Sequence, residues 1–179
     1  MDEITREFLT VARKYLREDY LPKIERCLER LTDEQVWWRA HETSNSIGNL
    51  LLHLEGNARQ WILCGVGGAR DARVRQREFD ERAQLPRAVL VEKLRATLDE
   101  VDGVLASLTA REFDGGRRSI QGNDVSVLEA VFHVVEHFSM HTGQIILLTK
   151  TLTASDLAFY DTSGGDPRPD WRRATPDDD

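Results

Sequence analysis

The chain has few of the residues that mark several classes of protein. It holds only two cysteines, Cys27 and Cys64, among 179 residues, which is too few for a disulfide framework and, by themselves, for a metal knuckle. No apolar run approaches the roughly 20 residues that a bilayer span needs. The opening Met1-Asp2-Glu3 lacks the basic stretch and the apolar segment of a secretory signal. We therefore expect a soluble cytoplasmic protein.

Positive charge is also scarce. Lys and Arg total 24 against 31 Asp and Glu, which gives a formal charge of −7 and a pI near 5.3. Nucleic-acid modules need a concentrated basic face, so we expect no nucleic-acid partner. The same balance leaves little for an anionic membrane surface to attract. A hydrophobic content of 40% with 31% charged residues excludes a wholly disordered chain, and the length suits one domain.

Four long segments have the apolar spacing of helices, and no alternating strand pattern of any length occurs. Pro22 predicts a kink or a break after Tyr20, Thr32 to Gln35 reads as a capping box, and Gly65 suits a left-handed helix stop. The four segments cover residues 3–31, 46–65, 86–108 and 126–152. This pattern predicts an all-α fold, an up-and-down bundle of four helices with long connections.

The connections and the tail differ from the helices in composition. Residues 114–124 are rich in turn residues and compatible with a short hairpin. Gly, Pro and Asp dominate from residue 163 onward. We expect residues 1–155 to form the bundle and residues 156–179 to form an extended or disordered acidic tail.

Three histidines of the fourth helix, His133, His137 and His141, are spaced i, i+4, i+8 and share one stripe. The outer two lie roughly 12 Å apart along the axis. One ion therefore reaches an adjacent pair but not all three, and the spacing alone leaves both pairs open. Histidines of a core or of a surface are the alternative interpretation.

The second helix carries a neutral polar stripe, Asn49, His53, Asn57 and Gln60, on an otherwise apolar segment. A solvent-facing stripe normally carries Lys and Glu, so this one favours the wall of a partly wet cavity over a hydrogen-bonded core histidine. His53 with His137 and His141 would leave a coordination position open, as catalytic zinc does, and nickel fits as well. Because the second and fourth helices are apolar around most of their circumference, we also expect a homodimer.

Other polar groups are weaker candidates. The arginines between Arg70 and Arg82 could bind the carboxylate of a thiol cofactor, but the acids among them favour a solvated loop. Glu136 points about 100° away from its neighbour His137 and is a weak candidate for a general base or for orienting a histidine. Cys27 and Cys64 read as small hydrophobic residues.

Two motifs resemble those of the DinB-like metalloproteins, which include the bacillithiol transferases and, more distantly, the mycothiol-dependent maleylpyruvate isomerase. They are Ser46-Ile-Gly-Asn-Leu-Leu-Leu-His53 and His133-Val-Val-Glu-His137-Phe-Ser-Met-His141-Thr-Gly-Gln144. The resemblance covers roughly residues 1–155. It implies an antiparallel four-helix bundle, often dimeric, that binds zinc or nickel. It also implies His53, His137 and His141 as ligands, with His133 a neighbour; Asn49, Asn57 and Gln144 would line the pocket.

Two functions follow from this interpretation. The first is a metal-dependent transferase that joins a low-molecular-weight thiol to a small electrophilic substrate. The alternative is a metal-binding dimeric bundle with a stress-related binding role and no turnover. A hydrolytic metal enzyme ranks third, because the sequence places no clear general base.

Overall fold

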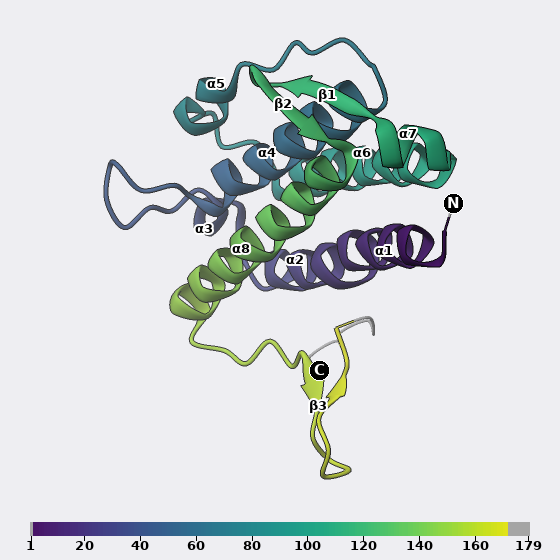
Figure 1. Cartoon of the computed structure of the whole chain (residues 1–179). Coiled ribbons are helices and arrows are strands. Elements are labelled where there is room, and N and C mark those ends of the chain that lie inside the picture. The colour runs from purple at the N-terminus through teal and green to yellow at the C-terminus, as the bar shows by residue number, and fades with distance from the viewer. Residues whose placement is uncertain (1, 172–179) are drawn as a thin grey trace.

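The computed structural model describes residues 2–171, and this part of the chain is mostly helical (Figure 1). The prediction of an all-α fold is confirmed. Within the described residues, no helix is long and apolar enough to cross a membrane. The elements in chain order are α1 (Glu3–Lys14), η1 (Tyr15–Tyr20), α2 (Leu21–Glu29), α3 (Asp33–Val36), α4 (Ile47–Ala58), η2 (Arg59–Val66), α5 (Arg75–Asp80), α6 (Arg87–Ser107), α7 (Ala110–Gly115), β1 (Arg117–Ile120), β2 (Asn123–Ser126), α8 (Val127–Thr153), β3 (Tyr160–Asp161) and β4 (Arg168–Pro169).

The predicted helix starts are confirmed by their caps. Ser46 and Ser126 accept hydrogen bonds from backbone N–H groups of the first turns of α4 and α8. Thr32 and Gln35 form the predicted capping box, and Pro86 immediately precedes α6. These starts depend on short-range hydrogen bonds, which explains why sequence alone locates them.

One change inside the helices agrees with the prediction and another differs from it. The first long segment passes through the wide helical turn of η1, and α2 begins at Leu21, next to Pro22, where the sequence predicts a kink or a break. The left-handed stop predicted at Gly65 is wrong, because η2 continues to Val66 and the left-handed glycine is Gly68 (φ 78°). Gly65 instead lets the side chain of Ile120 pack closely against the backbone, since a Cβ atom at Gly65 would collide with that side chain.

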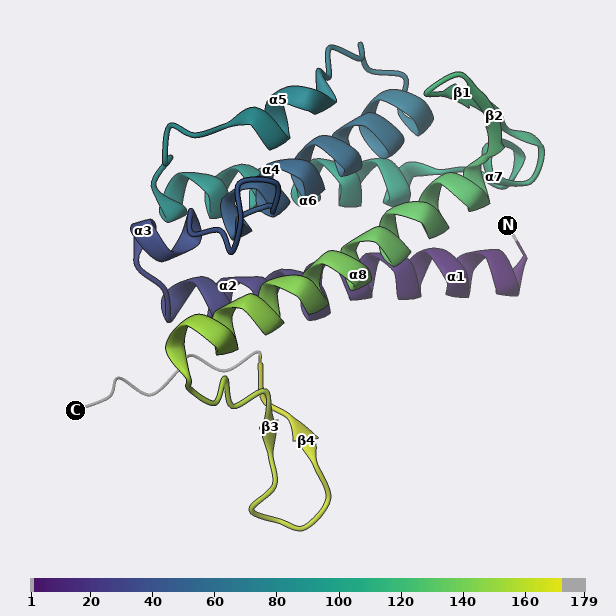
Figure 2. The same ribbon diagram turned by 90° about the vertical axis from the view of Figure 1, so that its left-hand side faces the viewer.

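The order of helix directions also differs from the expected antiparallel arrangement. At the middle of α6, Thr97 bonds Glu55 of α4, and near the end of α6 Val104 packs against Gly67, just past η2. The contacting residues follow the same order along both segments, so α4–η2 and α6 run parallel, as Figure 2 shows. The connection from residue 67 to 86, which contains α5, is long enough to return the chain to its starting end.

The core lies between the four long helical segments. Its largest fully buried side chains include Leu16, Ile24, Leu54, Leu98 and Phe138. The packing of these buried side chains holds α4 against α8, the two helices that carry the histidines predicted to bind metal.

Two short hairpins lie outside the helices. β1 and β2 pair antiparallel in the connection before α8, which confirms the predicted hairpin. β3 and β4 form a second hairpin within the predicted tail. It is attached by Arg26, whose guanidinium donates to the carbonyls of Ala158 and Asp170, and by Trp171, which donates to the carbonyl of Glu18. The tail therefore begins as an ordered hairpin, while its acidic end, residues 177–179, lies outside the described residues.

Candidate metal centre

Three histidines from two helices converge between α4 and α8. One ring nitrogen each of His53, His137 and His141 lies within 4.8 Å of the others. The Nε2 atoms of His53 and His137 are 2.9 Å apart. Of the two histidine pairs that the spacing on α8 left open, the structure brings His137 and His141 together with His53.

Two of these rings use Nδ1 for hydrogen bonds outside the centre. Nδ1 of His53 bonds the carboxylate of Glu78 at 2.8 Å, and Nδ1 of His141 bonds Oε1 of Gln144 at 2.7 Å. Both partners accept hydrogen bonds, which favours the tautomer with the lone pair on Nε2 of each ring; Nη2 of Arg73 also lies 3.2 Å from Nδ1 of His53. Nε2 of His141 is buried without a hydrogen-bond partner. A divalent ion bound by these nitrogens would satisfy it, so the residues fit a metal.

Burial favours the neutral form of His137 and His141, which ligation requires. The pKa of His137 is lowered from 6.5 to about 3, first by burial and then by the neighbouring rings of His141 and His53. Burial is also the main cause that lowers the pKa of His133 and of His141. At neutral pH the rings of His137 and His141 are therefore neutral.

A buried ion pair contacts His53 at Nδ1, whereas Nε2 of the same ring faces His137. Glu78 of α5 bonds His53 through Oε2 and receives two hydrogen bonds from Arg73, at 2.6 and 2.9 Å. The side chains of Arg73 and Glu78 are only 7% and 11% exposed. Burial alone would raise the pKa of Glu78, but the bonds from Arg73 and His53 outweigh it, and the pKa is lowered. An ionised carboxylate of this kind fixes the tautomer and orientation of a ligand histidine.

Gly56 makes room for this ion pair on the surface of α4. A Cβ atom there would collide with Oε1 of Glu78 and lie 2.9 Å from Nε of Arg73. The interpretation of the Arg70–Arg82 segment as a solvated loop is therefore wrong at Arg73 and Glu78. Gly56, three residues after His53 on an otherwise well-packed helix, is the signal in the sequence that the interpretation overlooked.

The remaining predicted pocket residues lie around the centre. Nε2 of His133 accepts from Nδ2 of Asn57 at 3.1 Å, and its ring packs on Trp61 at 3.9 Å between centroids. His133 is thereby a neighbour of the three converging rings, next to His137. Gln144 orients His141, as described above.

Asn49 has a structural role that the wet-cavity interpretation missed. Its side chain closes the capping box with Ser46, and Nδ2 donates to the carbonyl of Glu78 at 2.7 Å. Asn49 therefore fastens α5 to the first turn of α4. This contact holds the carboxylate of Glu78 close to His53.

Two weaker candidates lie away from the three histidines. Glu136 is exposed on α8. Burial raises the pKa of the Cys27 thiol to about 11, so this cysteine stays protonated at neutral pH and is unsuited to act as a nucleophile.

Comparison with known proteins identifies one family. No curated protein and no solved structure matches the chain. A relationship to DinB-like proteins is not confirmed by these comparisons. The sequence model of one family matches residues 3–163, which is most of the chain and includes all three converging histidines. The chain therefore belongs to the family described as "Protein of unknown function (DUF1572)".

Proposed function

We propose that His53, His137 and His141 bind one divalent metal ion, zinc or nickel. The observation that carries this proposal is the convergence of the three rings within 4.8 Å, with Nε2 of His141 buried and unpartnered. Three neutral nitrogen ligands suit both ions and leave a further coordination position open. The likeness of the histidine motifs to those of DinB-like proteins supports the same assignment.

The surrounding residues would hold the ligands in place. Glu78 orients His53, Gln144 orients His141, and the stacked His133 ring restricts His137 at 5.4 Å between centroids. When bound, a divalent ion in a site of neutral ligands supplies its full charge to lower the pKa of a thiol or a water.

We propose thiol transfer as the reaction of this site. The sulfur of a low-molecular-weight thiol would form a bond to the electrophilic carbon of a small compound, and the bond from that carbon to a leaving group such as chloride would break. The leaving group would depart as an anion while the thiol proton is released. The thiolate is the reactive form, so a site that lowers the pKa of a thiol favours the step. In the described chain, burial raises the pKa of both cysteines, Cys27 and Cys64, which disfavours the thiolate, so the thiol would come from a small molecule.

Metal analysis of the purified, untagged protein tests the metal centre. We expect about one zinc or nickel ion per chain, and loss of that ion in His137→Ala. His41→Ala is the control, because it removes an exposed histidine in the connection before α4; it should retain the ion. If the wild-type protein holds no metal after incubation with zinc or nickel, the metal proposal is wrong.

Thiol-conjugation assays test the reaction. The metal-loaded protein, the chelator-treated protein and His137→Ala are compared with cysteine as the thiol and an aromatic chloride as the electrophile, and then with a wider panel of each. We expect a rate that depends on the metal. Equal rates in all three, across the panel, would favour the alternative function of a metal-binding bundle without turnover.

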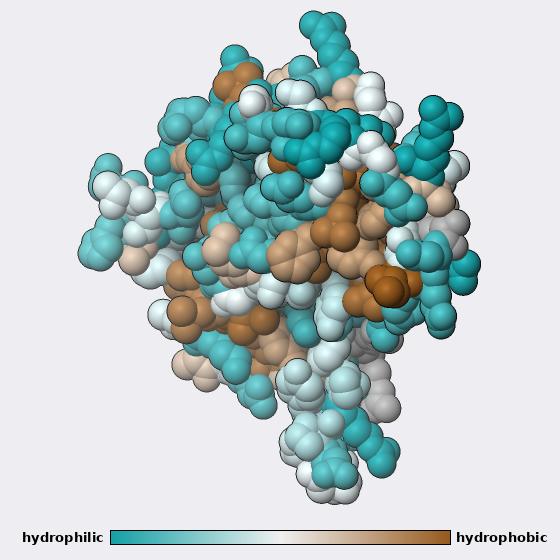
Figure 3. All heavy atoms as spheres, viewed as in Figure 1, coloured by the Kyte–Doolittle hydropathy of each residue, from teal (hydrophilic) through white to brown (hydrophobic). Residues whose placement is uncertain are grey.

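We also propose that the four long helical segments form a bundle of the DinB type and that the protein is a homodimer. Four apolar side chains on α8 support the dimer because they are 47–67% exposed: Leu128, Phe132, Met140 and Leu147. Figure 3 shows apolar atoms over α8 on this face of the molecule. Sedimentation analysis of the wild-type protein and of Phe132→Ser tests the dimer; a wild-type monomer at micromolar concentration would contradict it.

A further inference from the structure

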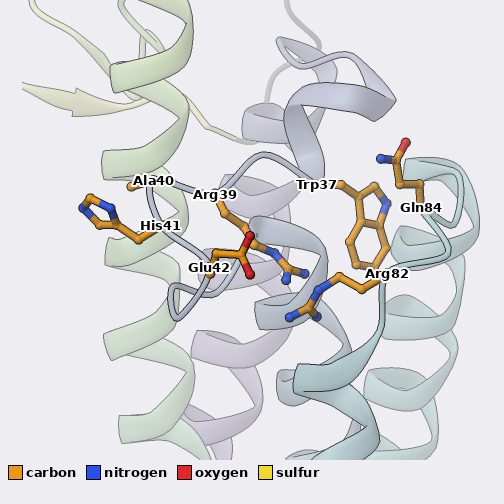
Figure 4. Close-up of a pocket in the computed structure, with 7 residues that line it drawn as sticks. All are labelled: Trp37, Arg39, Ala40, His41, Glu42, Arg82 and Gln84. Atoms are coloured by element: carbon orange, nitrogen blue, oxygen red, sulfur yellow. The ribbon is translucent and has the colours of Figure 1, made fainter.

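Two arginines from different connections meet at a single carbonyl oxygen. Arg39 lies between α3 and α4, and Arg82 follows α5. Nη2 of Arg39 and Nη1 of Arg82 donate to the carbonyl of Glu81, at 3.1 and 2.9 Å. The two positive groups are thereby held next to each other, at the wall of a pocket (Figure 4).

In the described part of the chain, no carboxylate lies within salt-bridge distance of either guanidinium. The other partners are neutral: Oδ1 of Asn49 for Arg39 at 2.5 Å, and the carbonyl of Phe79 for Arg82 at 2.6 Å. The carboxylate of Glu81 accepts instead from the backbone N–H groups of Arg82 and Ala83. Two adjacent positive charges therefore have only neutral acceptors.

Both guanidinium groups also have N–H donors that make no hydrogen bond within the described residues. Among the described residues, Arg39 bonds through Nη2 alone and Arg82 through Nη1 alone. A guanidinium has five N–H donors on three nitrogens, so both groups retain free N–H bonds. Pairs of such bonds match the two oxygens of a carboxylate or phosphate. The pKa of Arg39 is lowered by burial and then by the charge of Arg82, and an anion bound between them would relieve that repulsion.

The pocket has the size and walls of a small-molecule site. Its volume is about 460 Å³, and Trp37 and Gln84 form one wall. Glu42 lies on the side of Arg39, and the ring of His41 points away from the arginine pair (Figure 4). One carboxylate against two guanidiniums leaves a net positive charge, which suits a single anionic group.

We propose that Arg39 and Arg82 form a binding site for the oxyanion of a small molecule, a carboxylate or a phosphate group. Arg39 bonds Asn49, which lies one helical turn before His53, about 6 Å along the axis of α4. The oxyanion site does not depend on the proposed metal centre.

Calorimetric titration at constant ionic strength tests the site. Inorganic phosphate and succinate are titrated separately into the wild-type protein, and chloride replaces the anion in the blank. The same titrations in His137→Ala, which lacks a metal ligand, separate this proposal from the metal centre. Arg82→Gln and Arg39→Lys remove one guanidinium fork each, and the second keeps the charge. Arg77→Gln is the matched control, because it removes the same charge from the same connection outside the pocket.

We expect saturable binding of at least one of the two anions. Its dissociation constant should rise at least about tenfold in Arg82→Gln and in Arg39→Lys and stay unchanged in Arg77→Gln. Binding of phosphate alone assigns the site to phosphate compounds, and binding of succinate alone assigns it to carboxylates. The absence of saturable binding, or equal binding in Arg82→Gln and the wild-type protein, would overturn the proposal. If His137→Ala binds anions but no metal, the oxyanion site stands without the metal centre.

Discussion

The carboxylate of Glu78 lies 2.8 Å from Nδ1 of His53, although the two residues are 25 positions apart in the chain. His53 is on α4, and Glu78 is on the short helix of the connection that leads to α6. The contact sets which nitrogen of His53 faces His137 and His141. The orientation of one proposed ligand therefore depends on a segment that contributes no ligand itself.

Replacing Glu78 by Gln should weaken zinc binding by about 10- to 100-fold, the usual effect of losing such a supporting carboxylate. The amide cannot balance the charge of Arg73, which is 7% exposed, so stability should fall as well, by about 3–5 kcal/mol. Competition with a chromophoric chelator measures the affinity of the folded variant. Asp80→Asn, a loss of the same charge at an exposed position of the same helix, is the control. Unchanged zinc affinity in Glu78→Gln would show that His53 is oriented without the carboxylate.

Replacing Gly56 by Ala should also weaken zinc binding, because the added methyl group would displace Glu78 and Arg73. Alanine otherwise favours a helix over glycine by about 0.5–1 kcal/mol. Gly103→Ala provides the comparison, since Gly103 is inside α6 with nothing within 4 Å of an added Cβ atom. We expect Gly103→Ala to raise the melting temperature and Gly56→Ala to lower it. A rise in both variants, with zinc affinity intact, would mean that the ion pair adjusts without cost.

The metal-free protein should lose stability as the pH falls below 6.5. Folding lowers the pKa of His137 from 6.5 to about 3, so between these values the unfolded chain binds a proton that the folded chain does not. The free energy of unfolding therefore decreases toward acid, by about 1.4 kcal/mol per pH unit for one such group, and the full value is present above 6.5.

Urea denaturation between pH 7 and pH 4, with a chelator present, measures this slope. In His137→Leu the slope should be smaller by about one proton. His41→Leu changes an exposed histidine in the connection before α4 and should leave the slope as it is. Equal slopes in the wild-type protein and His137→Leu would contradict the predicted burial of a neutral ring.

Replacing Arg26 by Met should release the C-terminal hairpin. Arg26 is 4% exposed and holds the carbonyls of Ala158 and Asp170, and methionine offers no donor for either. Limited proteolysis followed by mass spectrometry should show faster cleavage within residues 154–171, whereas Arg95→Met, on α6, should leave the pattern unchanged. Equal cleavage rates in Arg26→Met and the wild-type protein would assign the attachment to Trp171.

The features that sequence predicts well here are local. Ser46 and Ser126 start their helices through bonds to residues three positions away, and such contacts follow from spacing alone. The stripe on α8 is equally local, since His137 and His141 share a face by helical periodicity. Including His53 in the same centre rested on the neutral polar stripe of its helix and on the resemblance to a known family, because periodicity does not say which helices face each other.

The features that sequence missed are set by distant contacts. Acids and arginines alternate between Arg70 and Arg82, and composition alone favours a solvated segment. Which of them turns inward depends on where α5 lies against α4, and that position follows from the bond between Asn49 and the carbonyl of Glu78. The parallel course of α4 and α6 escaped prediction for the same reason, because a long connection permits either direction.

The span of sequence between the proposed ligands affects when the site can exist. His53 and His137 are 84 positions apart, so synthesis must proceed into α8 before the rings can meet. Closing so large a loop is slow compared with forming the helices themselves. A divalent ion therefore has no preformed site in the early chain and would act mainly after assembly, by slowing the departure of α8 from α4.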